Sequence, residues 1–486
     1  MNESDTIRLR VLHTNDIHSR FGHMPRIASV IRTMRAETGE DCAIVLDIGD
    51  HMDRMFPETE GTDGAANIGV LNATGYDAVT LGNNEGLTYG IETLNRLYGR
   101  LARFPVAAGN LPLPRTEAGE AWTKPYVLLE RNGLKIGLIG VTAYFHQFYR
   151  LLGWDIREPF DTVARLVSLL RPQTDVLIVM SHLGLRADER LAADIAGIDL
   201  ILGGHTHHVL EEPLRVGDTL VCAAGKFGQY VGVVDLEIRK DASGRSIRGE
   251  GRLIPVEGWP AAPDIEALIA GYAETARIRL ERETVRLHDD LEARIDRESR
   301  LGNVLAAGLR KRTGAQIGLV NAGQLLGGLS RGPVTAGTLL KICPSPINPC
   351  RMELTGAQLL AALEQSLLPE YIDKPLYGFG FRGKVLGTLC VDGLRIEYDA
   401  AGPPLGKIRR VWVGPEGRQR KLEPQEIYTV GTIDMFTFGI GYLPIAEGTG
   451  VEYLLPDFLR DVLQEELADP EAVAASAAPR WLAIAP

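Results

Sequence analysis

Short apolar runs dominate the first half of the chain and alternate with helix-like stretches. Each run is rich in Val, Ile and Leu, which is typical of β-strands, and helical spacing between them predicts helices such as residues 25–35 and 160–170. This alternation predicts α/β layers. The runs are IRLRVLHTND (7–16), CAIVLDIGD (42–50), YDAVTLGNN (76–84), LKIGLIGV (134–141), TDVLIVMSH (174–182), IDLILGGHTHH (198–208) and DTLVCAAG (218–225).

The 486 residues are too many for one ordinary core and predict two domains. Around Pro255 the composition changes to the Pro/Gly-rich stretch PVEGWPAAP. Apolar residues then recur at helical spacing inside a charged stretch, which predicts a connecting helix. We therefore expect a catalytic domain over 1–258, a linker helix over 259–295 and a second, α+β domain over 296–486.

Composition limits the classes of partner. A formal net charge of −11 argues against nucleic acid, because phosphate backbones need a basic face. The longest apolar runs are far too short to span a bilayer. The N-terminal residues enter a strand-like run without the pattern of a signal peptide, and the odd, scattered set of 5 cysteines is typical of reduced thiols. A cytoplasmic protein with a small-molecule partner is expected.

Polar side chains stand where the apolar runs end. Ligands of open α/β sheets bind at the carboxyl ends of strands, so residues from separate runs converge on one crevice. Each residue alone is more simply explained as a polar turn residue, but five such motifs together indicate a site. The motifs TNDIHS, DIGD, GNN, SHLG and GGHTHH supply the candidate metal ligands Asp16, His18, Asp50, Asn83, His182, His205 and His207.

The chemistry of this set fits metal ions that act on phosphate. Histidine nitrogens combined with carboxylate and amide oxygens suit Mn, Zn, Fe or Co. Two such ions about 3.5–4 Å apart clamp a phosphoryl group for in-line attack. The sequence therefore predicts two divalent transition-metal ions as cofactors.

The series HTNDIHS, DIGD, LGNN, SHLG and GGHTHH resembles the metallophosphoesterase domain of the 5′-nucleotidase and 2′,3′-cyclic-nucleotide phosphodiesterase family. The second half is similar to that family's C-terminal domain, for example at LGNVLAAGLRKRTGAQIGLVNAG and IYTVGTIDMFTFGIGY. The resemblance covers nearly the whole chain and implies an N-terminal αββα sandwich and a C-terminal 5′-nucleotidase-type domain. It also implies one ion on Asp16, His18 and His207, another on Asn83, His182 and His205, and a bridging Asp50.

One departure from the family falls beside the metal ligands. The family has a histidine after the metal-binding asparagine, paired with an aspartate a few residues on, and here Asn84 and Leu87 take these positions. Asn84 cannot transfer a proton at neutral pH but still offers a neutral hydrogen bond. His51 or His208 is the alternative proton donor, so the candidate catalytic residues are Asn84 and His51.

Two further departures fall in the second domain. The family's NxGGxR reads NAGQLLGGL from Asn321, and its GGDGY reads FGIGY, with Ile440 in place of the aspartate. Candidate substrate-binding residues are Asn321 and two aromatic residues, Phe379 and Phe436, although a core position is equally compatible with each aromatic. The alternatives are Phe381 and Phe438 for stacking, and Arg331, Arg351, Arg382 and Arg395 for substrate charge.

The complete ligand set predicts a metal-dependent phosphoric ester hydrolase that acts on nucleotides or related phosphate esters and anhydrides. Possible types are a 5′-nucleotidase, a cyclic phosphodiesterase or a nucleotide-sugar hydrolase. The missing histidine and aspartate leave an alternative, which is a catalytically weakened protein of the same shape that binds nucleotides or regulates another protein.

Overall fold

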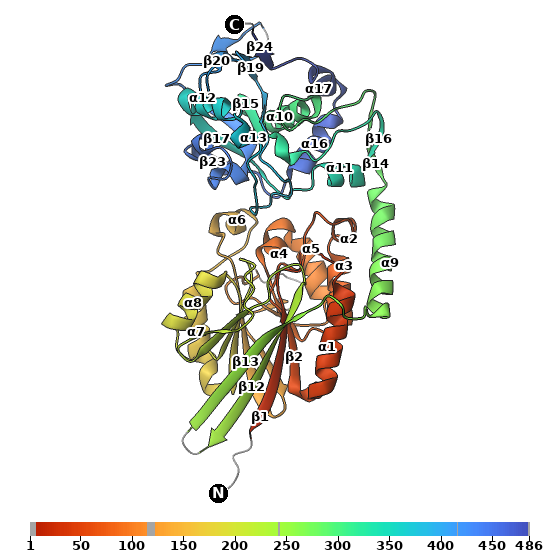
Figure 1. Ribbon diagram of the computed structural model, residues 1–486, viewed down its shortest axis with the longest axis vertical. Helices are drawn as coiled ribbons and strands as arrows, with labels where there is room; N and C mark the ends of the chain where they lie inside the picture. Colours follow the sequence, from red (N-terminus) through yellow and green to blue (C-terminus); the bar gives the residue numbers. More distant parts are fainter. Residues whose placement is uncertain (1–5, 114–121, 242–243, 416, 485–486) are drawn as a thin grey trace. The chain divides into compact units, whose positions relative to one another are not determined.

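The computed structural model describes residues 6–113, 122–241, 244–415 and 417–484. The chain divides into two compact units, Met1–Ala276 and Arg277–Pro486 (Figure 1). Among the described residues, no helix is both long and apolar enough to cross a membrane. The five cysteines are free thiols, and four of them are buried.

The N-terminal unit is built on two sheets. The first has the order β13-β12-β1-β2-β3-β4-β5, and β1 to β5 run parallel. Its strands are β1 (Ile7–Thr14), β2 (Ala43–Asp47), β3 (Ala78–Thr80), β4 (Val106–Ala107), β5 (Thr123–Lys124), β12 (Tyr230–Asp241) and β13 (Gly244–Pro255). The second has the order β10-β11-β9-β8-β7-β6, with strands β6 (Val127–Arg131), β7 (Leu134–Thr142), β8 (Val176–His182), β9 (Leu200–Gly203), β10 (Leu214–Val216) and β11 (Thr219–Ala223).

Alternate residues of these strands face different layers. Val11 and Leu46 lie in the core between the two sheets, whereas Leu12 and Val45 pack under the helices that cover the first sheet. The parallel strands are buried on both faces, which explains why their sequences read as nearly continuous apolar runs. The strands predicted from the seven runs are all present, and the αββα sandwich is confirmed.

Helices cover the outer face of each sheet (Figure 1). On the first sheet lie α1 (Met24–Thr38), α3 (Ala65–Thr74) and α5 (Ile91–Arg96). On the second lie α7 (Pro159–Leu170) and α8 (Leu185–Asp194). The predicted helices at 25–35 and 160–170 correspond to α1 and α7. Short helices in the loops are α2 (Pro57–Gly61), α4 (Asn83–Thr88) and α6 (His146–Leu151), with 3₁₀ turns at Glu40–Cys42 and Arg171–Gln173 and a π turn at Leu97–Leu101.

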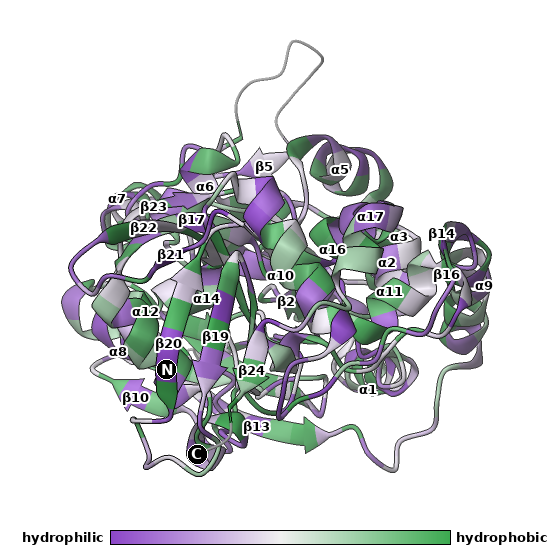
Figure 2. Ribbon diagram, turned by 90° about the horizontal axis from the view of Figure 1, so that it is seen from above, coloured by the Kyte–Doolittle hydropathy of each residue, from purple (hydrophilic) through white to green (hydrophobic). Residues whose placement is uncertain are grey.

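The connecting helix is shorter than the predicted linker. Helix α9 spans Pro263–Leu280, starts at a proline suited to the first helical turn, and carries both hydrophilic and hydrophobic segments in Figure 2. Residues Glu283–Leu287 then form strand β14, which pairs with β16 (Gly332–Thr335). The expectation of one helix over 259–295 was too long, because the charged stretch continues while its apolar spacing changes from helical to alternating.

The C-terminal unit combines sheets and helices, as predicted. One sheet has the order β18-β15-β22-β17-β23 and another the order β21-β20-β19-β24. Their strands are β15 (Ile317–Asn321), β17 (Pro349–Thr355), β18 (Leu389–Asp392), β19 (Leu394–Tyr398), β20 (Ile408–Val413), β21 (Arg420–Lys421), β22 (Ile427–Ile433), β23 (Thr449–Tyr453) and β24 (Trp481–Ala483). The helices are α10 (Arg300–Thr313), α11 (Ala336–Ile342), α12 (Gly356–Gln365), α13 (Pro369–Ile372), α14 (Asp434–Thr437), α15 (Leu443–Ala446), α16 (Leu459–Leu467) and α17 (Pro470–Ala475), with a 3₁₀ turn at Ala322–Gln324.

Candidate metal centre

The loops after β1 and β2 are joined by backbone hydrogen bonds. The N–H of Asp16 donates to the carbonyl of Gly49 at 3.0 Å, and that of His18 donates to the carbonyl of Asp50 at 2.9 Å. Gly49 has a φ of +90°, and a Cβ there would overlap the backbone of Gly82. The ends of β1, β2 and β3 are therefore packed against one another, with a glycine where two backbones meet.

Most of the predicted ligands adopt a left-handed backbone. Asp16 and His18 have φ of +51° and +47°, and Asp50, His205 and His207 have φ of +50°, +72° and +59°. Such conformations are costly for residues other than glycine and concentrate at functional sites. The turn at each strand end thus directs the ligand side chain toward a common point.

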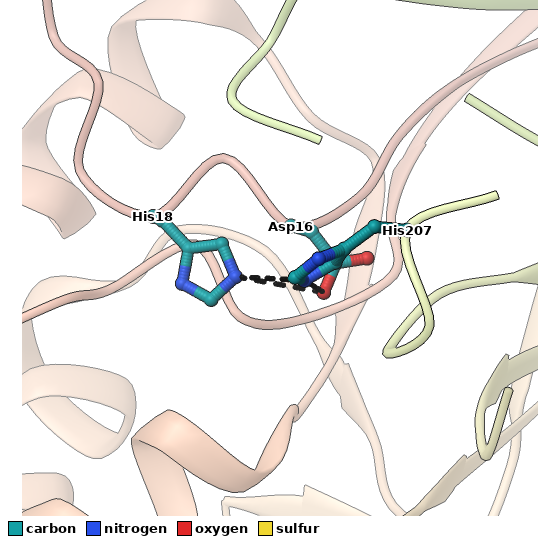
Figure 3. A group of neighbouring side chains, drawn as sticks. All are labelled: Asp16, His18 and His207. Atoms are coloured by element: carbon teal, nitrogen blue, oxygen red, sulfur yellow. Dashed lines mark hydrogen bonds and ion pairs between the residues drawn. The ribbon is translucent and has the colours of Figure 1, made fainter. Parts of the chain in front are cut away.

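Asp16, His18 and His207 form one group of ligand atoms (Figure 3). Nε2 of His207 lies 3.4 Å and Nε2 of His18 lies 3.8 Å from Oδ1 of Asp16. The two imidazole rings stand nearly perpendicular to each other, with 3.2 Å between their Nε2 atoms. This arrangement presents two nitrogens and one oxygen to a single cation.

Asp16, Asp50 and His182 form a second group. Nε2 of His182 lies 3.4 Å from Oδ1 of Asp50 and 4.0 Å from Oδ1 of Asp16. The other oxygen of Asp50 lies 3.9 Å from Nε2 of His18, so Asp50 contacts ligands of both groups. The ring of His205 packs edge-on against His182, with 5.3 Å between ring centres.

Two buried ligand atoms lack a hydrogen-bond partner within the described structure. They are Nε2 of His182 and Oδ1 of Asn83. Nδ1 of His182 lies 2.8 Å from the carbonyl of Ile48, and donation there leaves Nε2 with a free lone pair. Buried polar atoms are seldom unpaired, so both atoms fit a bound cation, and the residues present fit a two-metal site.

The electrostatics of the group favour positive charge. Burial raises the pKa of the Asp50 carboxyl, but the charges of His182 and His18 and the backbone N–H of Asn84 outweigh burial and hold that pKa well below its usual range. Burial likewise lowers the pKa of His182, and Asp50 and Asp16 reverse this and raise it to about 10. His205 is different, because burial and the charge of His182 lower its pKa to about 4. A divalent ion would replace the proton that His182 otherwise holds.

Glu85 supports the loop that carries Asp50. Its buried carboxylate accepts hydrogen bonds from three backbone N–H groups, those of Gly82 at 2.9 Å, Asp50 at 3.0 Å and Met52 at 2.9 Å. The sequence analysis missed this role, although Glu85 directly follows the LGNN motif. The feature of the sequence that could have indicated this role is an acidic residue directly after a ligand-bearing motif.

Asn84 is held by the protein. Its backbone N–H donates to Oδ1 of Asp50 at 2.8 Å, and its side-chain Nδ2 donates to the carbonyl of Met52 at 2.9 Å. Nδ2 also lies 3.1 Å from Nδ1 of His18. The amide of Asn84 is thus engaged by Met52 and His18 and lies behind a metal ligand, and its predicted catalytic role stays a prediction.

His51 is a poor proton donor in this structure. It is buried, its Nδ1 lies 3.2 Å from the amide nitrogen of Asn67, and its Nε2 makes no hydrogen bond with the described residues. Burial and the nearby charge of His18 lower the pKa of His51 to about 3, so its ring is neutral near pH 7. The other alternative, His208, is exposed, with Nδ1 2.8 Å from Oγ1 of Thr206.

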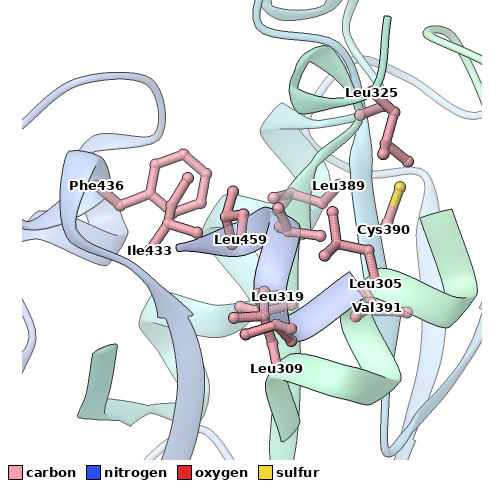
Figure 4. Close-up of a cluster of buried hydrophobic side chains, with 14 of the residues drawn as sticks. Leu305, Leu309, Leu319, Leu325, Leu389, Cys390, Val391, Ile433, Phe436 and Leu459 are labelled. Carbon is pink, nitrogen blue, oxygen red and sulfur yellow. The ribbon is translucent and has the colours of Figure 1, made fainter. Parts of the chain in front are cut away.

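Two of the three predicted substrate residues belong to the interior of the C-terminal unit. Asn321 is fully buried and donates from Nδ2 to the carbonyl of Leu386 at 2.7 Å. Phe436 is buried in the hydrophobic core (Figure 4). Their assignment to substrate contact is corrected here, because neither offers a free surface. Phe379 is 53% exposed and stacks on Phe438 with 5.8 Å between ring centres, so it remains available.

An αββα sandwich whose strand ends gather histidine, aspartate and asparagine around two adjoining groups defines a metal-dependent phosphoesterase. Residues 9–209 match the calcineurin-like phosphoesterase family, whose members use divalent metal ions, and residues 281–445 match the 5′-nucleotidase C-terminal domain. The chain belongs to the metallophosphoesterases that carry this C-terminal domain.

Similar proteins cover most of the chain. An uncharacterized metallophosphoesterase of Bacillus subtilis, YunD, is 34% identical over 467 residues, which cover 95% of this chain and 99% of that protein. A 5′-nucleotidase of Vibrio vulnificus is 24% identical and covers 87% of this chain and 84% of its own. The NAD nucleotidase of Haemophilus influenzae has a TM-score of 0.67 at 16% identity, covers 99% of this chain and 100% of its own, and so shares the fold.

Proposed function

We propose that this protein is a two-metal phosphohydrolase that acts on nucleotides or related phosphate esters and anhydrides. The observation that carries the proposal is Asp50, whose two oxygens lie beside His182 and His18, one from each ligand group. The 5′-nucleotidase of Vibrio vulnificus and the NAD nucleotidase of Haemophilus influenzae support a nucleotide-like substrate.

The metals in this proposal are two of Mn, Zn, Fe and Co, which suit a mixed nitrogen and oxygen ligand set. When bound, such ions polarise a phosphoryl group and activate water. Asp16, His18 and His207 would hold one ion, and Asn83, His182 and His205 the other, with Asp50 between them. Glu85 fixes the Asp50 loop, and Asn84 fixes the ring of His18.

The residues around the site favour leaving groups that need no proton. Asn84 cannot act as an acid, and His51 is neutral near pH 7 because burial lowers its pKa to about 3. The leaving groups of phosphoanhydrides and aryl phosphates depart without protonation. The ribose of a nucleoside ester, in contrast, leaves as a strongly basic alkoxide. The substrates in this proposal are therefore phosphoanhydrides in preference to simple 5′-nucleotides.

Turnover of p-nitrophenyl phosphate by protein loaded with Mn²⁺, Zn²⁺, Fe²⁺ or Co²⁺ tests the activity, and a screen of phosphate monoesters, diesters and anhydrides tests the substrate class. The engaged amide of Asn84 favours a second candidate, a catalytically weak protein that binds nucleotides. Tight nucleotide binding without turnover under every metal condition would establish that candidate.

The free cysteines support a location in the reducing cytoplasm, which fractionation of the native cells tests.

A further inference from the structure

Phe227 is held in an unfavourable backbone conformation beside the metal centre. Its φ is +61°, a region that bulky residues rarely adopt. Two hydrogen bonds maintain it: the N–H of Phe227 donates to the carbonyl of Asp16 at 2.7 Å, and its carbonyl accepts from Nδ1 of His23 at 2.6 Å. Residues held in such conformations cluster at functional sites, so the position of the Phe227 ring indicates a functional role.

The ring of Phe227 lies between a metal ligand and two cations. It packs edge-on against the imidazole of His18, with 5.8 Å between ring centres. The guanidinium carbon of Arg20 lies 4.5 Å from the Phe227 ring centre, and Nζ of Lys226 lies 4.8 Å from it. The Arg20 guanidinium also lies 4.9 Å from the ring of Phe56, so aromatic rings fix its place.

Neither cation has an acidic partner among the described residues, and no hydrogen bond of either side-chain head group is recorded there. Most arginines of the N-terminal unit differ in this respect; Arg10, for example, pairs with Asp235. Each cation therefore contacts the Phe227 ring without a neutralising acid. An anion beside Arg20 would gain a charge-assisted contact.

A cavity of about 580 Å³ adjoins these groups. Arg20, Phe56 and Phe227 line it, together with Glu58 and Gln229. Ser19, which follows His18 in the chain, lines it as well, and the Phe227 ring that lines it also packs against His18, so one wall of the cavity adjoins a metal ligand. Its volume is in the range of small-molecule sites. Lys226 contacts the Phe227 ring that forms part of this lining.

We propose that this cavity binds the second phosphoryl group of a phosphoanhydride substrate whose first phosphoryl group lies at the metal centre. Arg20 provides the planar fork that suits phosphate oxygens, and Lys226 adds a point charge. The inference rests on the proposed function and deepens it, because it names a residue of the N-terminal unit that would bind phosphoanhydride substrates.

The reaction balances without an acid. The oxygen of water bonds to the phosphorus at the metal centre, and the bond between that phosphorus and the bridging oxygen breaks. Its electron pair stays on the departing phosphate, and the two protons of the water pass to the phosphate products or the solvent. Arg20 and Lys226 stabilise the departing charge, which a proton donor would otherwise have to neutralise.

The test compares substrates and ligands that differ by one phosphoryl group. We expect Arg20→Gln to lower the ratio of kcat/KM for ADP to kcat/KM for p-nitrophenyl phosphate by about tenfold or more, as expected for a lost charge-assisted contact. Arg20→Lys should restore part of the ratio, and Lys226→Gln should lower it less. Arg165→Gln, which removes an exposed arginine of α7, is the matched control and should keep the parental ratio.

A binding measurement makes the test independent of turnover. Calorimetry on metal-loaded protein gives the affinity for methylenediphosphonate relative to inorganic phosphate, and Arg20→Gln should reduce this preference by about tenfold. Unchanged ratios in both assays would overturn the subsite even if the enzyme is active. If no phosphate ester is hydrolysed, the proposed function fails, and the calorimetric ratio still decides whether Arg20 binds a second phosphoryl group.

Discussion

Asn84 lies directly behind the metal ligand His18, with 3.1 Å between Nδ2 of Asn84 and Nδ1 of His18. The same amide donates to the carbonyl of Met52 at 2.9 Å, which fixes its orientation. A group that contacts the far nitrogen of a metal-binding imidazole sets the direction of that ring. Asn84 therefore contacts the metal ligand His18 from the side away from the metal centre.

The first prediction is that Asn84→Ala weakens metal binding. Loss of such supporting contacts typically costs about 10–100-fold in metal affinity, and we expect a change in this range for one of the two ions. Titration of the metal-free protein with Zn²⁺ in competition with a chromophoric chelator measures it. Asn132→Ala, in a surface turn, is the control, and equal affinities for both variants and the parent would contradict the role.

The second prediction concerns Asp50. In Asp50→Asn an amide replaces the carboxylate between the ligand groups, so the charge that would shield two cations from each other is lost. We expect the purified variant to retain at most one ion per chain, and activity to fall by roughly 10²-fold or more. Elemental analysis and p-nitrophenyl phosphate turnover measure these effects. Asp155→Asn, at an aspartate whose side chain is 76% exposed, should match the parent.

The third prediction concerns pH and the C-terminal unit. Burial raises the pKa of Asp434 to about 7, although N–H groups of Asn348 and Met435 oppose this shift. Between about pH 4 and pH 7 the folded protein keeps a proton on Asp434 that the unfolded chain releases. The free energy of unfolding therefore falls as pH rises through this window, by an amount on the order of a few kcal/mol, and the loss is complete above about pH 7.

Asp434→Asn removes this titration. Its unfolding midpoint in urea should depend less on pH between 5 and 7.5 than that of the parent, and near pH 7.5 the variant should be at least as stable. Glu447→Gln, a change at a surface acid of the same unit, is the control. A parent midpoint that rises with pH across this window would contradict a raised pKa at Asp434.

The sequence was sufficient for the sheets and for bringing Asp16, Asp50 and His182 into one group, and physical reasons explain this. Parallel strands buried on both faces leave strong apolar runs. The carboxyl ends of β1 and β2 in the first sheet and of β8 in the second lie close together, which groups Asp16, Asp50 and His182. A short sequence motif does not show which distant residues a side chain will contact. Asn321 and Phe436 are buried because distant segments pack over them, and no spacing rule reports such packing.

The sequence also could not predict the environment of Arg20 and Phe227 or the end of α9. The ring of Phe227 reaches His18 only because its backbone is left-handed, and contacts with Asp16 and His23, some 200 residues away in sequence, maintain that conformation. Helix α9 ends at Leu280 because the following residues pair as β14 with β16, about 50 residues further along the chain. Tertiary contacts decide such features.

The last prediction follows from the missing acid. Neither Asn84 nor neutral His51 can protonate a leaving oxygen near pH 7, and such assistance is usually worth about 10²–10⁴ in rate. Across a series of aryl phosphates, kcat/KM should fall steeply as the leaving phenol becomes more basic, by roughly 10²-fold or more from p-nitrophenyl to phenyl phosphate. His51→Gln should leave the slope of this dependence the same, because the neutral ring is too weak an acid to protonate a leaving group. A flat dependence in the parent would show that another residue protonates the leaving group, and a slope that steepens in His51→Gln would identify His51 as that residue.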